Sequence, residues 1–144
     1  MKFTPIAAAL FAVLLAGTAV PAAEFTINMV NKDASGNAMQ FEPACWKIAA
    51  GDTGHGGVVD KGHDTGTRAG GLPDGADGWR GKISQNLDVT LTVPGLYAFK
   101  CAPHFPMGMV GLIQVGDAPS NVDAIKALKL PSKATARLAE LLAQ

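Results

Sequence analysis

The segment Lys100-Cys101-Ala102-Pro103-His104-Phe105-Pro106-Met107-Gly108-Met109 places a thiol, an imidazole and two thioethers in one short stretch of chain. Strand-like runs lie on both sides of this segment: residues 96–101 lead into it, and residues 110–115 follow it. Sulfur ligands suit copper, and an imidazole suits several transition metals. Two histidines and one cysteine with a weak axial methionine form the ligand set of blue-copper sites. The segment supplies three of these groups, so a second histidine must come from elsewhere in the chain.

Two other histidines are available, and His63 is the better candidate. It follows the short apolar run Val58-Val59, which would anchor it at the end of a strand. His55 lies within Gly54-His55-Gly56-Gly57, a stretch with poor strand propensity. We therefore expect His55 to be a solvent-exposed loop histidine without a metal role.

The chain around these residues is rich in short strands separated by turns. Residues 25–30 alternate apolar and polar side chains, and residues 86–93 do the same with Leu87, Val89, Leu91 and Val93 on one face. Residues 40–48 resemble one strand interrupted at Pro43, and the glycine-rich stretch 51–81 is expected to be mostly loop. This spacing of strands predicts an all-β sandwich or barrel.

The C-terminal part of the chain changes to a helical period. Residues 121–129 place Val122, Ile125 and Leu128 on one side, and Pro131 can begin a second helix. We expect two short helices packed on the sandwich. The 144 residues have room for one domain, and a formal net charge of zero without a long basic run argues against nucleic-acid binding.

The first residues of the chain read as an export signal. Lys2 precedes an almost unbroken apolar run from residue 6 to residue 20, and small residues follow it. About 15 apolar residues are short for a bilayer core of ~30 Å, so a cleaved signal peptide is favoured over a membrane anchor. We predict a signal peptide at residues 1–22, with cleavage after Ala22 or Ala23, and one mature domain at residues 23–144.

Several motifs together resemble the pseudoazurin family of cupredoxins. They are Asn31-Lys32, Phe41-Glu42-Pro43-Ala44, Gly51-Asp52-Thr53, Asp60-Lys61-Gly62-His63, Lys82-Ile83, Cys101-Ala102-Pro103-His104 through Met109, and Val115-Gly116-Asp117. The resemblance runs from about residue 25 to the C-terminus. It implies a cupredoxin-like Greek-key β-sandwich with two short C-terminal helices.

The resemblance also implies a ligand set for one copper ion that alternates between Cu(I) and Cu(II). The family spacing Cys-x2-His-x4-Met falls on Cys101, His104 and Met109, and the upstream histidine falls on His63. Met107 would satisfy the Cys-x2-His-x2-Met spacing of amicyanin, so the axial ligand is a choice between two methionines. We favour Met109 and expect Met107 to be an apolar wall residue.

The chain departs from the family pattern in the Gly54-His55-Gly56-Gly57 stretch, at Cys45, and at two positions that directly follow predicted ligands. The family commonly has Asn after the first histidine, where it tethers the ligand loop by hydrogen bonds, and here that residue is Asp64. The residue after Cys101 is Ala102 instead of the usual Thr. Hydrogen bonds around the cysteine sulfur tune the reduction potential of such sites.

The resemblance and the export signal imply a periplasmic one-electron carrier. Because the four ligands leave no open coordination position for a substrate, we do not expect an enzyme. Its implied partner is a redox enzyme of denitrification such as copper nitrite reductase, and the mature form is expected to be a monomer away from the membrane. His104 would open to the surface through an apolar patch ringed by basic residues. The predicted docking residues are Lys32, Lys61, Arg80, Lys82, Lys100, Phe105, Pro106 and Met107.

Two other interpretations remain open at this point. Export would permit a disulfide between Cys45 and Cys101, which would make the chain a metal-free β-sandwich interaction module. We favour a free, buried Cys45 instead, because Cys101 has matched ligand partners in its own loop. The second alternative is a copper storage or delivery protein, which would need an exposed and exchangeable site.

Overall fold

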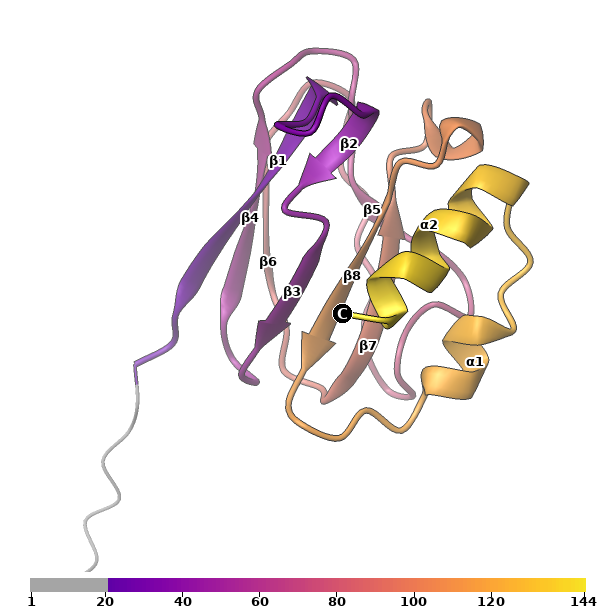
Figure 1. Ribbon diagram of the computed structural model, residues 1–144. Coiled ribbons are helices and arrows are strands. Elements are labelled where there is room, and N and C mark those ends of the chain that lie inside the picture. The colour runs from indigo at the N-terminus through magenta and orange to yellow at the C-terminus, as the bar shows by residue number, and fades with distance from the viewer. Residues whose placement is uncertain (1–20) are drawn as a thin grey trace, which may run out of the picture.

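The computed structural model describes residues 21–144, so the predicted signal peptide lies almost wholly outside the described residues. Two four-stranded sheets face each other (Figure 1). The first sheet has the order β2 (Ala38–Glu42), β1 (Glu24–Lys32), β4 (Thr53–Val58) and β6 (Leu87–Thr90). The second has the order β3 (Cys45–Ile48), β8 (Val110–Val115), β7 (Gly95–Lys100) and β5 (Gly66–Thr67). The predicted β-sandwich is confirmed.

The pair β7 and β8 occupies the middle of the second sheet. The two strands are antiparallel, with Gly95 opposite Val115 at one end and Lys100 opposite Val110 at the other. All but one residue of each strand is buried, because the first sheet covers one face and the helices cover the other. The segment that joins the strands at the Lys100 end is the predicted ligand loop, and it therefore starts and finishes on rigid structure.

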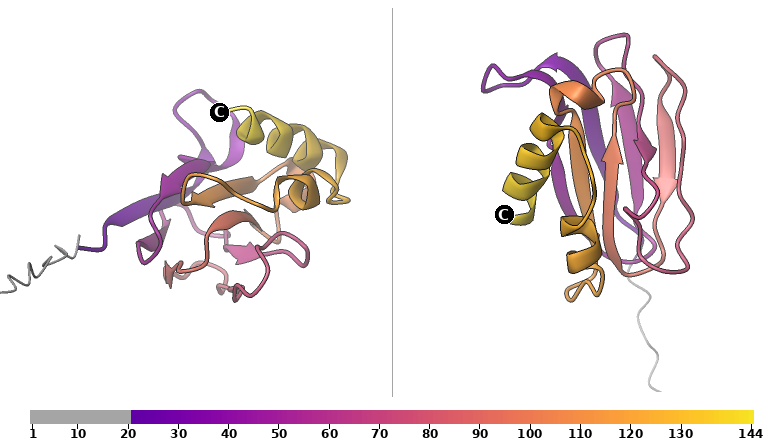
Figure 2. Two further views of the ribbon diagram at one scale, coloured as in Figure 1. Left: turned by 90° about the horizontal axis from the view of Figure 1, so that it is seen from below. Right: turned by 90° about the vertical axis from the view of Figure 1, so that its right-hand side faces the viewer.

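Both C-terminal helices are present on the outer face of the second sheet (Figure 2). Helix α1 (Val122–Lys126) packs near β7, and α2 (Ser132–Leu142) packs against β8 and the short 3-10 helix η1 (Phe105–Met107). The apolar stripe Ala134, Leu138 and Leu141 is buried. The helical period in the sequence thus predicted both the helices and the face of α2 that contacts the sheet.

The expectation of one interrupted strand at residues 40–48 is wrong. The strands β2 and β3 belong to different sheets, and the chain crosses from one layer to the other at Pro43 and Ala44. Proline has no N–H with which to continue a strand ladder. The carbonyl of Ala44 instead accepts a hydrogen bond from the Leu112 N–H at 2.8 Å, which attaches the crossing to β8.

The expectation that residues 51–81 are mostly loop is wrong for β4. This strand lies between β1 and β6 and is hydrogen-bonded to both. A Cβ atom at Gly54 would lie 2.6 Å from Cζ of Phe25, so the glycine makes room for a ring from the neighbouring strand. Pairing on both sides therefore outweighs the poor strand propensity of Gly54-His55-Gly56-Gly57.

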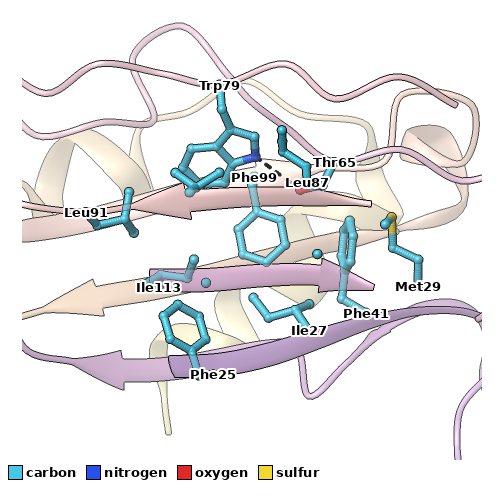
Figure 3. A pocket seen from close by; sticks show the side chains of 13 residues that line it. Phe25, Ile27, Met29, Phe41, Thr65, Trp79, Leu87, Leu91, Phe99 and Ile113 are labelled. Atoms are coloured by element: carbon cyan, nitrogen blue, oxygen red, sulfur yellow. Dashed lines mark hydrogen bonds between the residues drawn. The ribbon is translucent and has the colours of Figure 1, made fainter. Parts of the chain in front are cut away.

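Apart from Val58, the side chains that fill the core between the sheets come from parts of the chain other than β4. Figure 3 shows rings and aliphatic chains around a small apolar cavity of about 30 Å³. The rings of Phe41 and Phe99 meet edge to face with centroids 4.7 Å apart. At the border of the cavity the indole N–H of Trp79 donates to Oγ1 of Thr65 at 3.2 Å. Large side chains from the other elements thus fill the space that the glycines of β4 leave open.

Among residues 21–144, no helix has both the length and the apolar character needed to cross a membrane.

Candidate metal centre

Three of the predicted ligand side chains converge at one end of the sandwich. Nδ1 of His104 lies 3.3 Å from Sγ of Cys101, and Nδ1 of His63 lies 3.7 Å from the same sulfur. Their ligand atoms all lie within 4.8 Å of one another, and the two imidazole centroids are 4.6 Å apart. Within the described part of the chain this is the one cluster of histidine, cysteine or carboxylate groups with such geometry.

The loop that carries His63 is fixed by hydrogen bonds to residues just before β6. Gly62 has a φ of 96°, a left-handed conformation that suits glycine. Its N–H donates to Oγ of Ser84 at 2.9 Å, and the His63 carbonyl accepts from the Ser84 N–H at 2.8 Å. The anchor predicted for His63 exists, although it is this turn and not the last residue of a strand.

The orientation of the His63 ring is set by Asn31 at the end of β1. Nε2 of His63 lies 3.0 Å from Oδ1 of Asn31, so the nitrogen donates and the amide oxygen accepts. This tautomer leaves the lone pair of Nδ1 directed at the sulfur of Cys101. A second partner that fixes the tautomer is typical of metal-binding histidines. Asn31 was not predicted as a site residue, because the two positions are separated by 32 residues and no spacing rule connects them.

The Asp64 carboxylate connects the His63 loop with the Cys101 loop. Its Oδ1 accepts a hydrogen bond from the N–H of Ala102 at 2.6 Å. The tether that the family resemblance assigns to an asparagine is therefore made here by an aspartate. It holds the residues that follow the two ligands, His63 and Cys101, against each other.

Burial acts on the protonation of the site. His63 and Cys101 are fully buried, whereas His104 is half-buried. Burial lowers the pKa of His63, and the nearby His104 lowers it further. Burial raises the pKa of the Cys101 thiol, and backbone hydrogen bonds from Asp64 and His104 act in the opposite direction. A neutral imidazole is the form that binds a metal, and metal binding displaces the proton of the thiol.

The two methionines of the loop differ sharply in burial. Met109 is fully buried, and its backbone accepts from the Cys101 N–H at 3.1 Å and donates to the His104 carbonyl at 3.3 Å. Met107 is 45% exposed. Between them Gly108 has a φ of 95°, which lets the chain leave η1 and enter β8. The backbone of Met109 is thus tied to both ligands that precede it, whereas Met107 lies on the surface.

The two cysteines are both free, which argues against the disulfide-linked module. Cys101 lies in the ligand cluster, whereas Sγ of Cys45 lies 4.0 Å from the carbonyl oxygen of Leu141 in α2. Cys45 is half-buried, less than expected from the sequence, and this burial raises the pKa of its thiol. Its side chain takes no part in the cluster.

His55 is not the loop residue that the sequence suggested. It lies within β4 and is half-buried. Its Nδ1 lies 2.6 Å from Oδ1 of Asp88, and its Nε2 lies 3.7 Å from Oε2 of Glu24. The pKa of His55 is raised, chiefly by the hydrogen bond to Asp88. His55 is absent from the metal-ligand cluster, as expected.

Most of the predicted docking residues are exposed, and Lys100 and Phe105 are half-buried. Phe105, next to His104, has Nζ of Lys100 at 4.7 Å from its ring centroid and the guanidinium carbon of Arg68 at 5.6 Å. Arg68 was not predicted. It also donates to the carbonyl oxygen of Lys129 at 2.7 Å, which connects the surroundings of the loop to the α1–α2 connection.

The donor set matches one metal better than others. One sulfur and two imidazole nitrogens lie within 4.8 Å of one another, and the buried thioether of Met109 belongs to the loop that carries Cys101 and His104. Structural zinc sites usually take four cysteine or histidine ligands, whereas the cluster here offers three. Soft sulfur ligands together with two imidazoles in a trigonal arrangement suit copper. The residues present therefore fit a copper ion.

Comparisons with known proteins agree with this geometry. The family of copper-binding proteins of the plastocyanin/azurin type matches residues 28–116. The chain is 45% identical to a pseudoazurin from Paracoccus pantotrophus over 96% of this chain and 95% of that protein. It is 40% identical to a pseudoazurin from Methylorubrum extorquens over 96% of this chain and 94% of that protein.

A solved pseudoazurin structure from Hyphomicrobium denitrificans superimposes with a TM-score of 0.80 at 40% identity, covering 84% of this chain and 97% of that one. The sequence motifs, the cupredoxin sandwich and the converging sulfur and imidazole groups thus agree. The chain belongs to the pseudoazurins of the copper-binding plastocyanin/azurin family, which are electron-transfer proteins and not enzymes.

Proposed function

We propose that the protein is a periplasmic one-electron carrier whose copper is held by His63, Cys101 and His104, with Met109 as the axial ligand. The observation that carries this proposal is the convergence of Nδ1 of both histidines on the Cys101 sulfur. When bound there, copper supplies a Cu(I)/Cu(II) couple to the protein. The choice of Met109 over Met107 is supported by its burial and by its backbone bonds to the ligand loop.

The chain holds its donor atoms in place by contacts that do not depend on the metal. Asn31 fixes the His63 ring, and Asp64 fixes the peptide after Cys101. Full burial of His63, Cys101 and Met109 excludes water from three of the four proposed ligands. A site held in this way changes little between two oxidation states, and a small rearrangement lowers the barrier to electron transfer.

His104 provides the path for electrons to the surface. It is the half-buried member of the set, and in the loop it is followed by the half-buried Phe105 and then by the exposed Pro106 and Met107. Together with Phe105 these residues form a small apolar surface beside the ligand ring. Such a surface can approach a partner closely and exclude water between the two redox centres.

The basic residues around this surface would attract an acidic partner. Among the described residues, none of the five predicted docking cations forms a salt bridge with a carboxylate. Free positive charges speed encounter with a negatively charged surface, and salt screens the effect. We propose a periplasmic redox enzyme of denitrification as the partner, for which copper nitrite reductase is the leading candidate. The five cations are Lys32, Lys61, Arg80, Lys82 and Lys100.

A storage or delivery role fits this site less well. A protein that hands over its metal needs ligands that solvent or a partner can reach, whereas His63, Cys101 and Met109 are fully buried. Only His104 offers an exposed edge. We therefore assign the metal a resident role, and export by the signal peptide places the mature monomer in the periplasm.

Addition of copper to the purified protein tests the proposal directly. We expect intense visible colour in the oxidised form, from charge transfer between the Cys101 sulfur and Cu(II). The variant Cys101→Ser should lose the colour, and the matched variant Cys45→Ser should keep it because that thiol lies beside α2. A colourless Cu(II) complex of the unaltered protein would contradict the proposal.

A further inference from the structure

Asp52 has a buried carboxylate at the end of the sandwich opposite the ligand loop. The residue is 8% exposed, and it precedes β4. Its Oδ2 accepts a hydrogen bond from the N–H of Ala49 at 2.9 Å, and its Oδ1 accepts one from the N–H of Ala23 at 2.8 Å. Both partners are backbone groups, and one of them lies next to the predicted cleavage site.

This carboxylate has no cationic partner within residues 21–144. The ion pairs of that region involve other residues, and both donors to Asp52 are neutral peptide groups in the uncleaved chain. A buried carboxylate is costly unless opposite charge and hydrogen bonds compensate for it. A positive charge at the nitrogen of Ala23 would supply the missing compensation without any movement of the chain.

We infer that the export signal is cleaved between Ala22 and Ala23, and that the α-ammonium group released on Ala23 binds the Asp52 carboxylate. This inference depends on the export that the proposed function includes. Hydrolysis consumes one water molecule: the Ala22 carbonyl becomes a carboxylate, and the Ala23 nitrogen becomes an amine that takes up a proton. Signal peptidase is the catalyst implied by the leader.

Cleavage one residue later would damage the same end of the fold. The carbonyl oxygen of Ala23 accepts the N–H of Thr53 at 3.0 Å, so Ala23 is already paired with the start of β4. Loss of Ala23 would remove that acceptor and also the donor to Asp52. Signal peptidase favours small residues one and three positions before the cut. Cleavage after Ala22 puts Ala22 and Val20 at these positions, whereas cleavage after Ala23 would put Ala23 and Pro21 there.

The ammonium–carboxylate pair would fix the beginning of the β1–β4 ladder. The first pair of that ladder is Glu24 with Thr53, directly after Ala23 and Asp52. Other charges near this end are the Glu24 carboxylate and its neighbours His55 and Asp88 on the adjacent strands. Since Glu24 is paired with His55 at 3.7 Å, Asp52 is the carboxylate that contacts the new terminus directly.

The first test is the N-terminus of the exported protein. The full chain of 144 residues is expressed with its own leader, recovered from the periplasm, and analysed by intact mass and N-terminal sequencing. We expect the terminus Ala23-Glu24-Phe25. A terminus at Glu24, or at any residue before Ala23, would overturn the inference. The measurement does not involve copper, so a colourless protein with the correct terminus would contradict the proposed function alone.

The second test asks whether the charge on Ala23 matters. A serine inserted between Ala22 and Ala23 keeps the peptide N–H at Asp52 but moves the ammonium group away. We expect this insertion to lower the unfolding temperature by about 4 °C with Asp52 present, and to have no effect in the Asp52→Asn variant. An equal effect of the insertion in both backgrounds would overturn the pairing.

A chemical readout covers the case in which Asp52→Asn does not fold. Acylation of an N-terminal amine requires its unprotonated form, and a carboxylate partner raises the pKa of that amine. If the carboxylate raises the pKa of the amine by about one unit, the Ala23 terminus should react about tenfold more slowly near neutral pH than the terminus of the insertion variant. Equal rates would overturn the pairing.

Discussion

Asn31 holds His63 by a hydrogen bond of 3.0 Å from Nε2 to the amide oxygen, which joins β1 to the loop that follows β4. This bond decides which imidazole nitrogen faces the sulfur of Cys101. It also joins a strand of the first sheet to a residue proposed to bind metal. The contact makes the orientation of His63 a property of the fold as well as of the metal.

Replacement of Asn31 by alanine should weaken copper binding. The ring of His63 would lose the acceptor that fixes its tautomer, and loss of such partners costs about 10–100-fold in metal affinity. Competition for Cu(I) with a chelator of known affinity measures the change. Asn37→Ala is the matched control, since Asn37 lies in the β1–β2 connection and hydrogen-bonds only to Asp33. Equal affinities in the two variants would contradict the role of Asn31.

Replacement of the two loop methionines by leucine separates the candidate axial ligands. Met109→Leu should shift the visible spectrum and raise the reduction potential, because a buried thioether is lost from the proposed ligand set. Met107→Leu should leave both nearly unchanged, because that side chain is 45% exposed. Absorption spectra and potentiometric titration of both proteins provide the measurement. The opposite pattern would assign the axial role to Met107.

Asp64→Asn should keep the tether between the loops and raise the reduction potential. The amide oxygen can still accept the Ala102 N–H, but a negative charge next to His63 is removed. Less negative charge favours Cu(I), by about 1 kcal/mol or roughly 40 mV for a charge several ångströms away. Asp77→Asn, at an exposed site without a hydrogen bond to its side chain, is the control. A potential that falls or does not change would contradict this electrostatic role.

Removal of docking charges should slow electron exchange with an acidic partner and reduce its salt dependence. Lys61→Gln removes one exposed cation near the ligand end, and Lys47→Gln removes a cation of β3 that pairs with Asp117. Stopped-flow measurement of the rate of electron exchange at several salt concentrations distinguishes the two variants. We expect a slower rate for Lys61→Gln only, since the encounter depends on charge near the exposed ligand edge. Rates that do not depend on salt would exclude a basic docking face.

His55 should make the stability depend on pH near neutrality. The Asp88 hydrogen bond raises the pKa of His55 in the folded protein above its ordinary value. The resulting stabilisation is fully present below the unfolded pKa of about 6.5 and is lost as pH rises through the folded pKa. Asp88→Asn should therefore lower the unfolding temperature more at about pH 5.5 than at about pH 8.5. Thermal unfolding of both proteins measures this, and a loss independent of pH would contradict the linkage.

Some of the fold could be predicted from local pattern and some could not. Strands β7 and β8 and helix α2 follow from unbroken apolar runs or from helical period. Strand β4 could not be predicted, because its glycines have low propensity and its position depends on the Phe25 ring across the sheet. The crossing at Pro43 also escaped prediction, since the apolar pattern on its two sides is the same whichever sheet each side joins.

The residues of the site likewise include some that the sequence predicted and some that it did not. Cys101, His104 and Met109 share one loop, so their spacing alone suggested a metal site. His63 needed its position after an apolar run and the resemblance to a family. Asn31 and Arg68 were not found, because their contacts with His63 and Phe105 join positions far apart in the chain.

The proposed copper site lies where the two layers of the sandwich meet. His63 follows β4 of the first sheet and is held by Asn31 of β1, whereas the loop with Cys101 and His104 joins β7 to β8 of the second. A metal bound by His63 and by the loop with Cys101 and His104 would cross-link the two sheets at this end of the sandwich. Unfolding would then require loss of the ion, so the resistance of this protein to heat would rise and fall with the supply of copper.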